Sequence, residues 1–253
     1  MNTGQPTPGA LAEPDGRTRE LATGLDAVRH RIEAACAAAG RDPAEVHLIV
    51  VTKTHPAADV VRLAGLGVRD VGESRDQEAG AKHREVTAAL APAGADRSPL
   101  RWHFIGRLQS NKARHVAAYA DVVHSVDRLG LVEALDRGAA ASGRRLDCLV
   151  QVSLDGDPTR GGAPVPQVPE LADRLAATTQ LTVAGVMAVA PLGADPRAAF
   201  AALREVSERL RHAHPGAVII SAGMSGDLEA AVTEGATHLR VGSAVLGQRP
   251  PLG

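Results

Sequence analysis

Eight alternations of a short β-rich run with a helical stretch fill most of this 253-residue sequence and restrict its fold more than any other feature. The strand-like runs lie at residues 47–52, 68–72, 102–105, 121–126, 146–154, 181–189, 217–222 and 237–242. Strands that alternate with helices predict a parallel sheet, and eight such units predict closure into a barrel. The alternative is an open doubly wound sheet, but its first-turn glycine fingerprint is absent after residues 47–52. We therefore expect an α/β fold that is a single (β/α)8 barrel of the TIM type.

One further helix is expected before the first strand. Apolar residues recur at helical spacing over 18–39, namely Leu21, Leu25, Val28, Ile32 and Ala35. Residues 1–16 are rich in Pro and Gly and lack an apolar stretch, so we expect a disordered lead-in rather than a secretory signal. The barrel should then occupy residues 17–253, and we find no second domain beyond the eighth unit.

Composition narrows the function classes. Only 2% of the residues are aromatic, so the core must be built from aliphatic side chains. The net charge of −1 provides no field that would attract nucleic acid or anionic lipid. Cys36 and Cys148 lie far apart, which favours a reduced, cytoplasmic protein. No window is apolar enough to span a bilayer, and the ten histidines show no metal-binding spacing.

Lys53 is the first candidate for chemistry, because the carboxyl ends of the strands carry the active sites of such barrels. It follows the first strand directly. An inward-pointing ammonium would be desolvated, a setting that favours a lysine nucleophile able to form a Schiff base. A solvated surface lysine is an equally good interpretation of position alone.

Two loops at the end of the chain add a second signal. Phosphate sites in these barrels often form after strands seven and eight. The seventh strand runs into Gly223, Ser225 and Gly226, and the eighth into Gly242 and Ser243. Glycine admits a phosphate close to the backbone and serine adds a hydroxyl donor, although ordinary turns have the same composition.

Arg240 lies within the eighth strand, where a buried guanidinium needs a partner. A barrel carboxylate is one possible partner. The pyridine nitrogen of pyridoxal 5′-phosphate (PLP) is another, and a permanently charged arginine would keep that nitrogen unprotonated. Such a ring is a weak electron sink, which disfavours transaminase or decarboxylase chemistry.

Three segments carry a family resemblance: VTKTHP (51–56), WHFIGRLQSNK (102–112) and AGMSGDLEAAVTEGATHLRVGSAVLG (222–247). Over residues 20 to 250 the chain resembles the pyridoxal phosphate homeostasis proteins, which share the barrel of the alanine racemase N-terminal domain. The resemblance implies a Schiff base between PLP and Lys53, a phosphate held by Ser225, Gly242 and Ser243, and Arg240 at the pyridine nitrogen. Met187 would fill the barrel near the ring.

The chain departs from the family pattern in two places. Ser74 stands where the family usually has an asparagine near the cofactor, so a ring contact there loses its amide. Residues 159–162 read Thr-Arg-Gly-Gly where the family usually has Lys-x-Gly. Ser74 stays in the expected cofactor site.

The resemblance implies a protein that holds PLP and delivers it to apo forms of PLP-dependent enzymes, with no catalytic residue assigned. The single-domain barrel suggests a monomer, and the cysteines suggest the cytoplasm. The alternative is a racemase-like PLP enzyme. Racemases of this fold need a second base, usually a tyrosine from a second domain, and the single tyrosine here, Tyr119, is expected in the helix after the third strand. A barrel that uses Lys53 for aldol chemistry on another phosphate is a third possibility.

Overall fold

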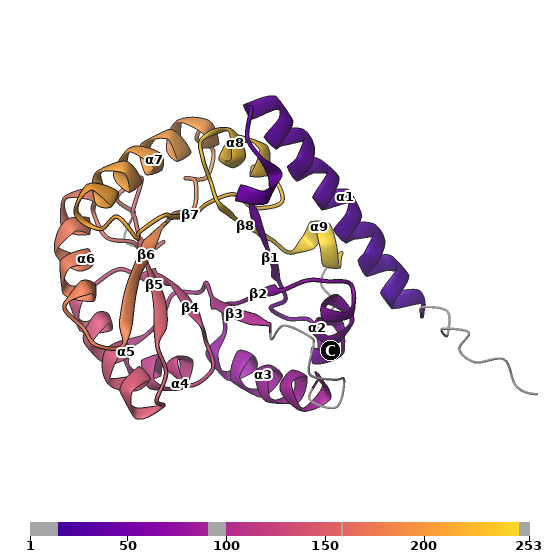
Figure 1. Cartoon of the computed structure of the whole chain (residues 1–253), viewed down its shortest axis with the longest axis horizontal. Coiled ribbons are helices and arrows are strands. Elements are labelled where there is room, and N and C mark those ends of the chain that lie inside the picture. The colour runs from indigo at the N-terminus through magenta and orange to yellow at the C-terminus, as the bar shows by residue number, and fades with distance from the viewer. Residues whose placement is uncertain (1–14, 91–99, 158, 248–253) are drawn as a thin grey trace, which may run out of the picture.

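Eight parallel strands form a closed barrel in the computed structural model, which describes residues 15–90, 100–157 and 159–247. Neighbours in sequence are neighbours in the barrel, and β8 closes against β1 (Figure 1). The strands are β1 (His47–Val51), β2 (Asp70–Glu73), β3 (Arg101–Phe104), β4 (Val122–Val126), β5 (Leu146–Gln151), β6 (Leu181–Met187), β7 (Ile219–Ser221) and β8 (His238–Val241). The predicted barrel is confirmed.

Helices surround the barrel and connect its strands (Figure 1). They are α1 (Gly16–Ala39), α2 (Ala57–Gly65), α3 (Asp76–Leu90), α4 (Ala113–Ala117), α5 (Leu129–Ala141), α6 (Val168–Ala176), α7 (Pro196–Ala213), α8 (Leu228–Thr233) and α9 (Ser243–Leu246), with short 3-10 turns η1 (Pro43–Glu45), η3 (Ser110–Lys112) and η4 (Val165–Gln167). Within the described residues, no helix is both long enough and apolar enough to cross a membrane.

The extra N-terminal helix is present as α1 and packs against α8 and α9. Its buried face contains Leu21, Leu25, Val28 and Ile32, as the periodicity predicts. The Asp15 carboxylate accepts a hydrogen bond from the Thr18 N–H at 2.7 Å and caps the helix. Asp15 and Gly16, assigned to the lead-in from the sequence, are therefore the cap and first residue of α1. Residues 1–14 of that lead-in lie outside the described residues.

Several predicted boundaries were wrong. The fifth strand ends at Gln151 rather than at residue 154, because the Ser153 N–H donates to the Ala163 carbonyl and the chain leaves the sheet. The second strand begins at Asp70 rather than at residue 68. Tyr119 lies in the turn after α4, which ends at Ala117, and not within a helix.

The core is aliphatic, as the composition predicts. Phe104 and Phe200 are the largest fully buried side chains, and Val, Leu, Ile and Ala supply most of the rest. Cys148 lies on β5 and is fully buried in this core.

Gly185 permits an irregular pairing inside β6. The register with β5 shifts between Cys148 and Leu149, so one β6 residue is bypassed as in a bulge. Gly185 adopts φ +151°, and a Cβ at this position would lie 1.9 Å from the Ile219 carbonyl oxygen on β7. Only glycine fits here, because both the backbone angle and the neighbouring strand exclude a side chain.

Gly185→Ala is therefore expected to lower the free energy of unfolding by about 3 kcal/mol, the sum of backbone strain and overpacking. Denaturant unfolding measures this change. Gly130→Ala in α5 is the matched control, since nothing lies within 4 Å of its added Cβ, and it should be neutral or slightly stabilising. Equal stability of the two variants would contradict the close packing of β6 on β7.

Two histidines lie side by side at the amino-terminal ends of β1 and β8. The rings of His47 and His238 stack with their centroids 4.8 Å apart. Burial, followed by the neighbouring His47, lowers the pKa of His238 to about 3. His238 is therefore neutral in the folded protein at neutral pH.

This shift predicts a loss of stability in acid. Between the ordinary imidazole pKa of about 6.5 and about 3, the unfolded chain binds a proton at His238 that the folded chain does not. Stability should fall as pH is lowered through this window, by about 1.4 kcal/mol per pH unit for this histidine. In unfolding experiments from pH 7 to 4, the stability of His238→Gln should fall less steeply with decreasing pH than that of the wild type. His30→Gln, at an exposed position of α1, should keep the wild-type slope. An unchanged slope in His238→Gln would refute the assignment.

Candidate functional site

A cavity of about 570 Å³ lies at the carboxyl ends of β1, β3, β7 and β8. Five of the predicted site residues line it together: Lys53, Ser225, Arg240, Gly242 and Ser243. The remaining lining residues are Val51, Thr54, His55, Ile105, Met224, Gly226 and Gly247. The cavity is at the end of the barrel where sites of this fold are built.

Ser74 and Met187 are not among the lining residues. The Ser74 carbonyl packs against Gly106, where an added Cβ would be 2.2 Å from it, so the loops after β2 and β3 touch. Met187 is buried at the end of β6 in a small apolar cluster with Val122, Leu149 and Ala184. Met187 thus fills the barrel interior.

The backbone around Lys53 is held in an unusual conformation. Thr54 has φ +68°, a value that β-branched residues rarely adopt. The Thr54 N–H donates to the Glu78 carboxylate, and the Lys82 ammonium donates to the Thr52 carbonyl at 2.8 Å. The residues on either side of Lys53 are therefore anchored by two side chains from α3.

Lys82 is the centre of a buried cluster of charged side chains that joins these two anchors. Its ammonium donates to Glu73 Oε1 at 2.7 Å and to Glu78 Oε1 at 2.9 Å, and Glu73 also accepts the Thr52 hydroxyl at 2.7 Å. Burial raises the pKa of Glu73 even beside Lys82. Burial acts in the same direction on Glu78, but hydrogen bonds from Lys82 and the Thr54 N–H hold its pKa below the ordinary value.

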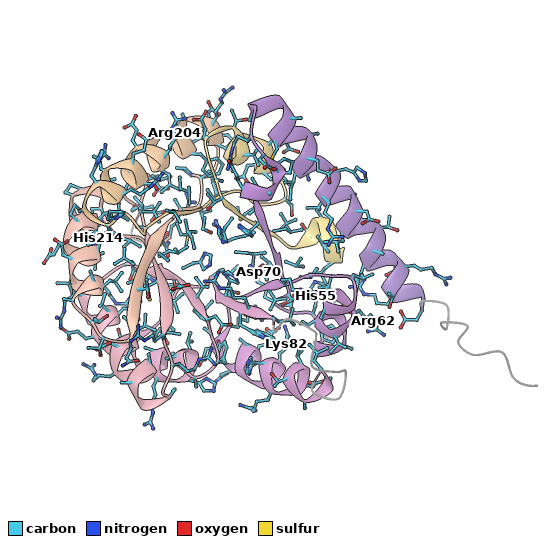
Figure 2. All side chains as sticks on the ribbon, in the orientation of Figure 1. His55, Arg62, Asp70, Lys82, Arg204 and His214 are labelled. Carbon is cyan, nitrogen blue, oxygen red and sulfur yellow. The ribbon has the colours of Figure 1, made fainter. Side chains whose placement is uncertain are left out.

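Sequence reasoning missed this cluster. Glu78 and Lys82 stand four residues apart on one helix, a spacing that brings opposite charges together and was the available signal. Figure 2 shows Lys82 between α3 and the barrel strands, with His55 nearby on the α2 side.

Arg240 is buried in β8 and has neutral partners. Its guanidinium donates to the Ser221 hydroxyl at 2.6 Å and to the Ala188 carbonyl at 2.9 Å. In the described part of the chain, no carboxylate forms an ion pair with Arg240, so the barrel-carboxylate interpretation was wrong. Burial lowers the pKa of Arg240 to about 10, and the guanidinium remains charged at neutral pH.

The loops after β7 and β8 bring two serines together. The hydroxyls of Ser225 and Ser243 lie 3.4 Å apart. The β7 loop closes on itself, since the Asp227 N–H donates to the Met224 carbonyl at 3.2 Å. A Cβ on Gly242 would lie 3.2 Å from the Val51 carbonyl, which shows how closely the β8 loop approaches the strand that carries Lys53.

Tyr119 is remote from this cavity. It is buried beside His83, with ring centroids 5.9 Å apart, and it does not line the cavity. Lys112, the last residue of the WHFIGRLQSNK segment, lies 4.0 Å from the Asp76 carboxylate and does not line the cavity. Neither residue is placed to act on a ligand bound between Lys53 and Arg240.

Comparisons with known proteins find relatives that cover most of the chain. A family model described as alanine racemase, N-terminal domain, matches residues 24–250. A pyridoxal phosphate homeostasis protein of Mycobacterium tuberculosis is 47% identical over 249 residues, which cover 94% of this chain and 96% of the relative. PipY of Synechococcus elongatus, solved with PLP bound, is 36% identical with a TM-score of 0.75, covering 90% of this chain and 100% of PipY.

A more distant likeness concerns the fold alone. Alanine racemase from Corynebacterium glutamicum is 16% identical with a TM-score of 0.61, covering 90% of this chain and 62% of the racemase.

The ion cluster predicts a large effect for Lys82→Met, which leaves Glu73 and Glu78 without their cation. The expected loss is about 3 kcal/mol of unfolding free energy at neutral pH, because an uncompensated buried charge is costly. The loss should shrink in acid as the carboxylates take up protons. Lys112→Met is the control, since Lys112 is partly exposed, lies 4.0 Å from Asp76 and leaves that carboxylate its contact with His115; it should cost less than about 1 kcal/mol. Similar losses in both variants, measured by denaturant unfolding, would show that the cluster is not a buried support.

Proposed function

Because this chain belongs to the pyridoxal phosphate homeostasis protein family, which has the barrel of the alanine racemase N-terminal domain, we propose that it binds PLP on Lys53 and takes part in intracellular PLP homeostasis and delivery. The proposal includes a Schiff base between Lys53 and the aldehyde. It includes no strong enzymatic turnover.

One observation carries the proposal: a lysine, two serine hydroxyls and a buried arginine border the same cavity. Lys53 would hold the aldehyde of PLP. Ser225, Gly242 and Ser243 would hold the phosphate, the serines through their hydroxyls and Gly242 by allowing close approach. Arg240 would donate to the pyridine nitrogen.

Two features of the structure fit PLP in this position. Thr54 lines the cavity, and its buried hydroxyl has no hydrogen-bond partner among the described residues. Arg240 is charged, lines the cavity and has only neutral partners there. A ligand with a phosphate, hydroxyl and ring-nitrogen acceptors would complement both groups.

The charge of Arg240 also favours binding of PLP over catalytic turnover. PLP, when bound, supplies an aromatic ring that withdraws electrons from an attached amine. Arg240 can only donate hydrogen bonds, and its pKa of about 10 keeps it charged, so it favours an unprotonated ring nitrogen. The ring is then a weaker electron sink. The position of Tyr119 away from the cavity also disfavours racemisation.

Ser74 and Met187 take indirect parts in the proposal. Ser74 would support the loop beside the cavity through its backbone contact with Gly106. Met187 would pack beneath the ring as barrel filling. Apo forms of PLP-dependent enzymes are the proposed recipients, and we expect the carrier to be a monomer.

The central test is a PLP titration of the purified protein with a visible absorbance readout. The wild-type chain should develop a band that Lys53→Ala loses and Lys112→Ala keeps. Borohydride reduction should leave a PLP adduct that mass spectrometry locates on Lys53. A band that survives loss of Lys53 would overturn the proposal, and amino-acid racemisation or transamination well above that of Lys53→Ala would revive the enzyme alternative.

A further inference from the structure

A continuous line of hydrogen bonds crosses the barrel interior and ends at Arg240. Asp70 Oδ1 lies 2.9 Å from His103 Nε2, and His103 Nδ1 lies 2.9 Å from His124 Nε2. His124 Nδ1 lies 3.0 Å from the Ser221 hydroxyl, which accepts from Arg240 at 2.6 Å. The five residues come from β2, β3, β4, β7 and β8.

The line joins two regions of the barrel. Asp70 begins β2 at the amino-terminal end, with 19% of its side chain exposed, and Figure 2 places it inside the ring of strands. Arg240 borders the cavity at the carboxyl-terminal end. The three groups between them are almost fully buried.

The charge states at the two ends fix the direction of every hydrogen bond. Arg240 can only donate, so the Ser221 oxygen accepts from it and the Ser221 proton is available for His124 Nδ1. A carboxylate can only accept, so His103 must donate to Asp70 from Nε2. His103 Nδ1 then accepts from His124 Nε2. All donors point from Arg240 toward Asp70.

The ionisation of these groups agrees with this direction. Burial lowers the pKa of His103 and lowers that of His124 well below the ordinary value, so both imidazoles are neutral at neutral pH. Burial acts to raise the pKa of Asp70, but the hydrogen bond from His103 together with neighbouring positive charge, including Arg101, lowers it overall, and the group stays ionised. The opposite direction would set an imidazole lone pair against this carboxylate.

Other charged and titratable groups near Asp70 do not replace this connection. Arg101 pairs with Asp147, and His238 is neutral because burial lowers its pKa to about 3. Among the described residues, the side chain that donates a hydrogen bond to the Asp70 carboxylate is His103.

We propose that a one-way chain of hydrogen bonds, which we call the relay, positions the Arg240 guanidinium; its members are Asp70, His103, His124 and Ser221. The Ser221 oxygen and the Ala188 carbonyl fix two nitrogens of Arg240, so the guanidinium is oriented before any ligand arrives. The four residues are positioning residues. Their effect on PLP rests on the proposed function, whereas the direction of the relay does not.

The direction is tested on the full chain without PLP, by nitrogen-15 NMR of labelled histidines at neutral pH. His103 and His124 should both be neutral with the proton on Nε2. In Asp70→Asn the side-chain amide can donate as well as accept, so a population with the proton on Nδ1 should appear at both histidines. Asp147→Asn, a carboxylate change on the neighbouring strand β5, should leave both unchanged. A doubly protonated or Nδ1-protonated imidazole in the wild-type protein would overturn the relay.

The positioning role is tested by PLP affinity. Ser221→Ala removes the acceptor of Arg240 and should raise the Kd for PLP about tenfold, a typical cost for a hydrogen bond to a charged group. Asp70→Asn should raise the Kd less, and Asp147→Asn should not change it. The reduced adduct should remain on Lys53 in all three variants.

The outcomes separate the two proposals. Wild-type affinity in both Ser221→Ala and Asp70→Asn would overturn the positioning role and leave PLP binding intact. If the wild-type protein bound no PLP, the proposed function would fail and the histidine NMR would still decide the relay. Asp70→Asn preserves size and one hydrogen bond, so it provides the test even where Ser221→Ala is poorly folded by circular dichroism.

Discussion

The pairing of β1 with β8 is the interaction on which the site depends. Residues 47–50 pair with residues 238–241, and this pairing of the first strand with the last closes the barrel. It brings the segment after β1, with Lys53, against the turn at Gly242 and Ser243. About 190 residues separate these groups in sequence, and without closure they would share no cavity.

Two buried cations, Lys82 and Arg240, contribute to the site in different ways. Lys82 lies against two carboxylates and a carbonyl, so its charge is compensated locally and it secures the backbone beside Lys53. Arg240 donates to two neutral groups, the Ser221 hydroxyl and the Ala188 carbonyl, and Asp227 is the carboxylate whose charge acts to raise its pKa. The first cation supports the wall of the cavity, whereas the second stays available to a ligand.

Local patterns made much of this structure predictable. The strand runs, Lys53 and the Gly/Ser turns after β7 and β8 are contiguous in sequence, and the fold places such positions at the cavity. The relay could not be predicted, because it joins single residues from strands that meet only after closure. Strand five was predicted too long, because apolarity continues past the point where Ser153 turns to pair with Ala163.

The cavity is organised before a ligand binds, and this property suits the proposed carrier role. The backbone beside Lys53 is fixed from α3, and the Arg240 guanidinium is fixed by Ser221 and Ala188, so both ends of the cavity are set without a ligand. A preformed site loses little conformational entropy when it fills, and it needs no rearrangement to empty. In the proposed complex, the same Arg240 that would orient the ring nitrogen would also limit the electron withdrawal that catalysis requires. Under the proposed function, firm binding and weak catalysis would both follow from one buried guanidinium.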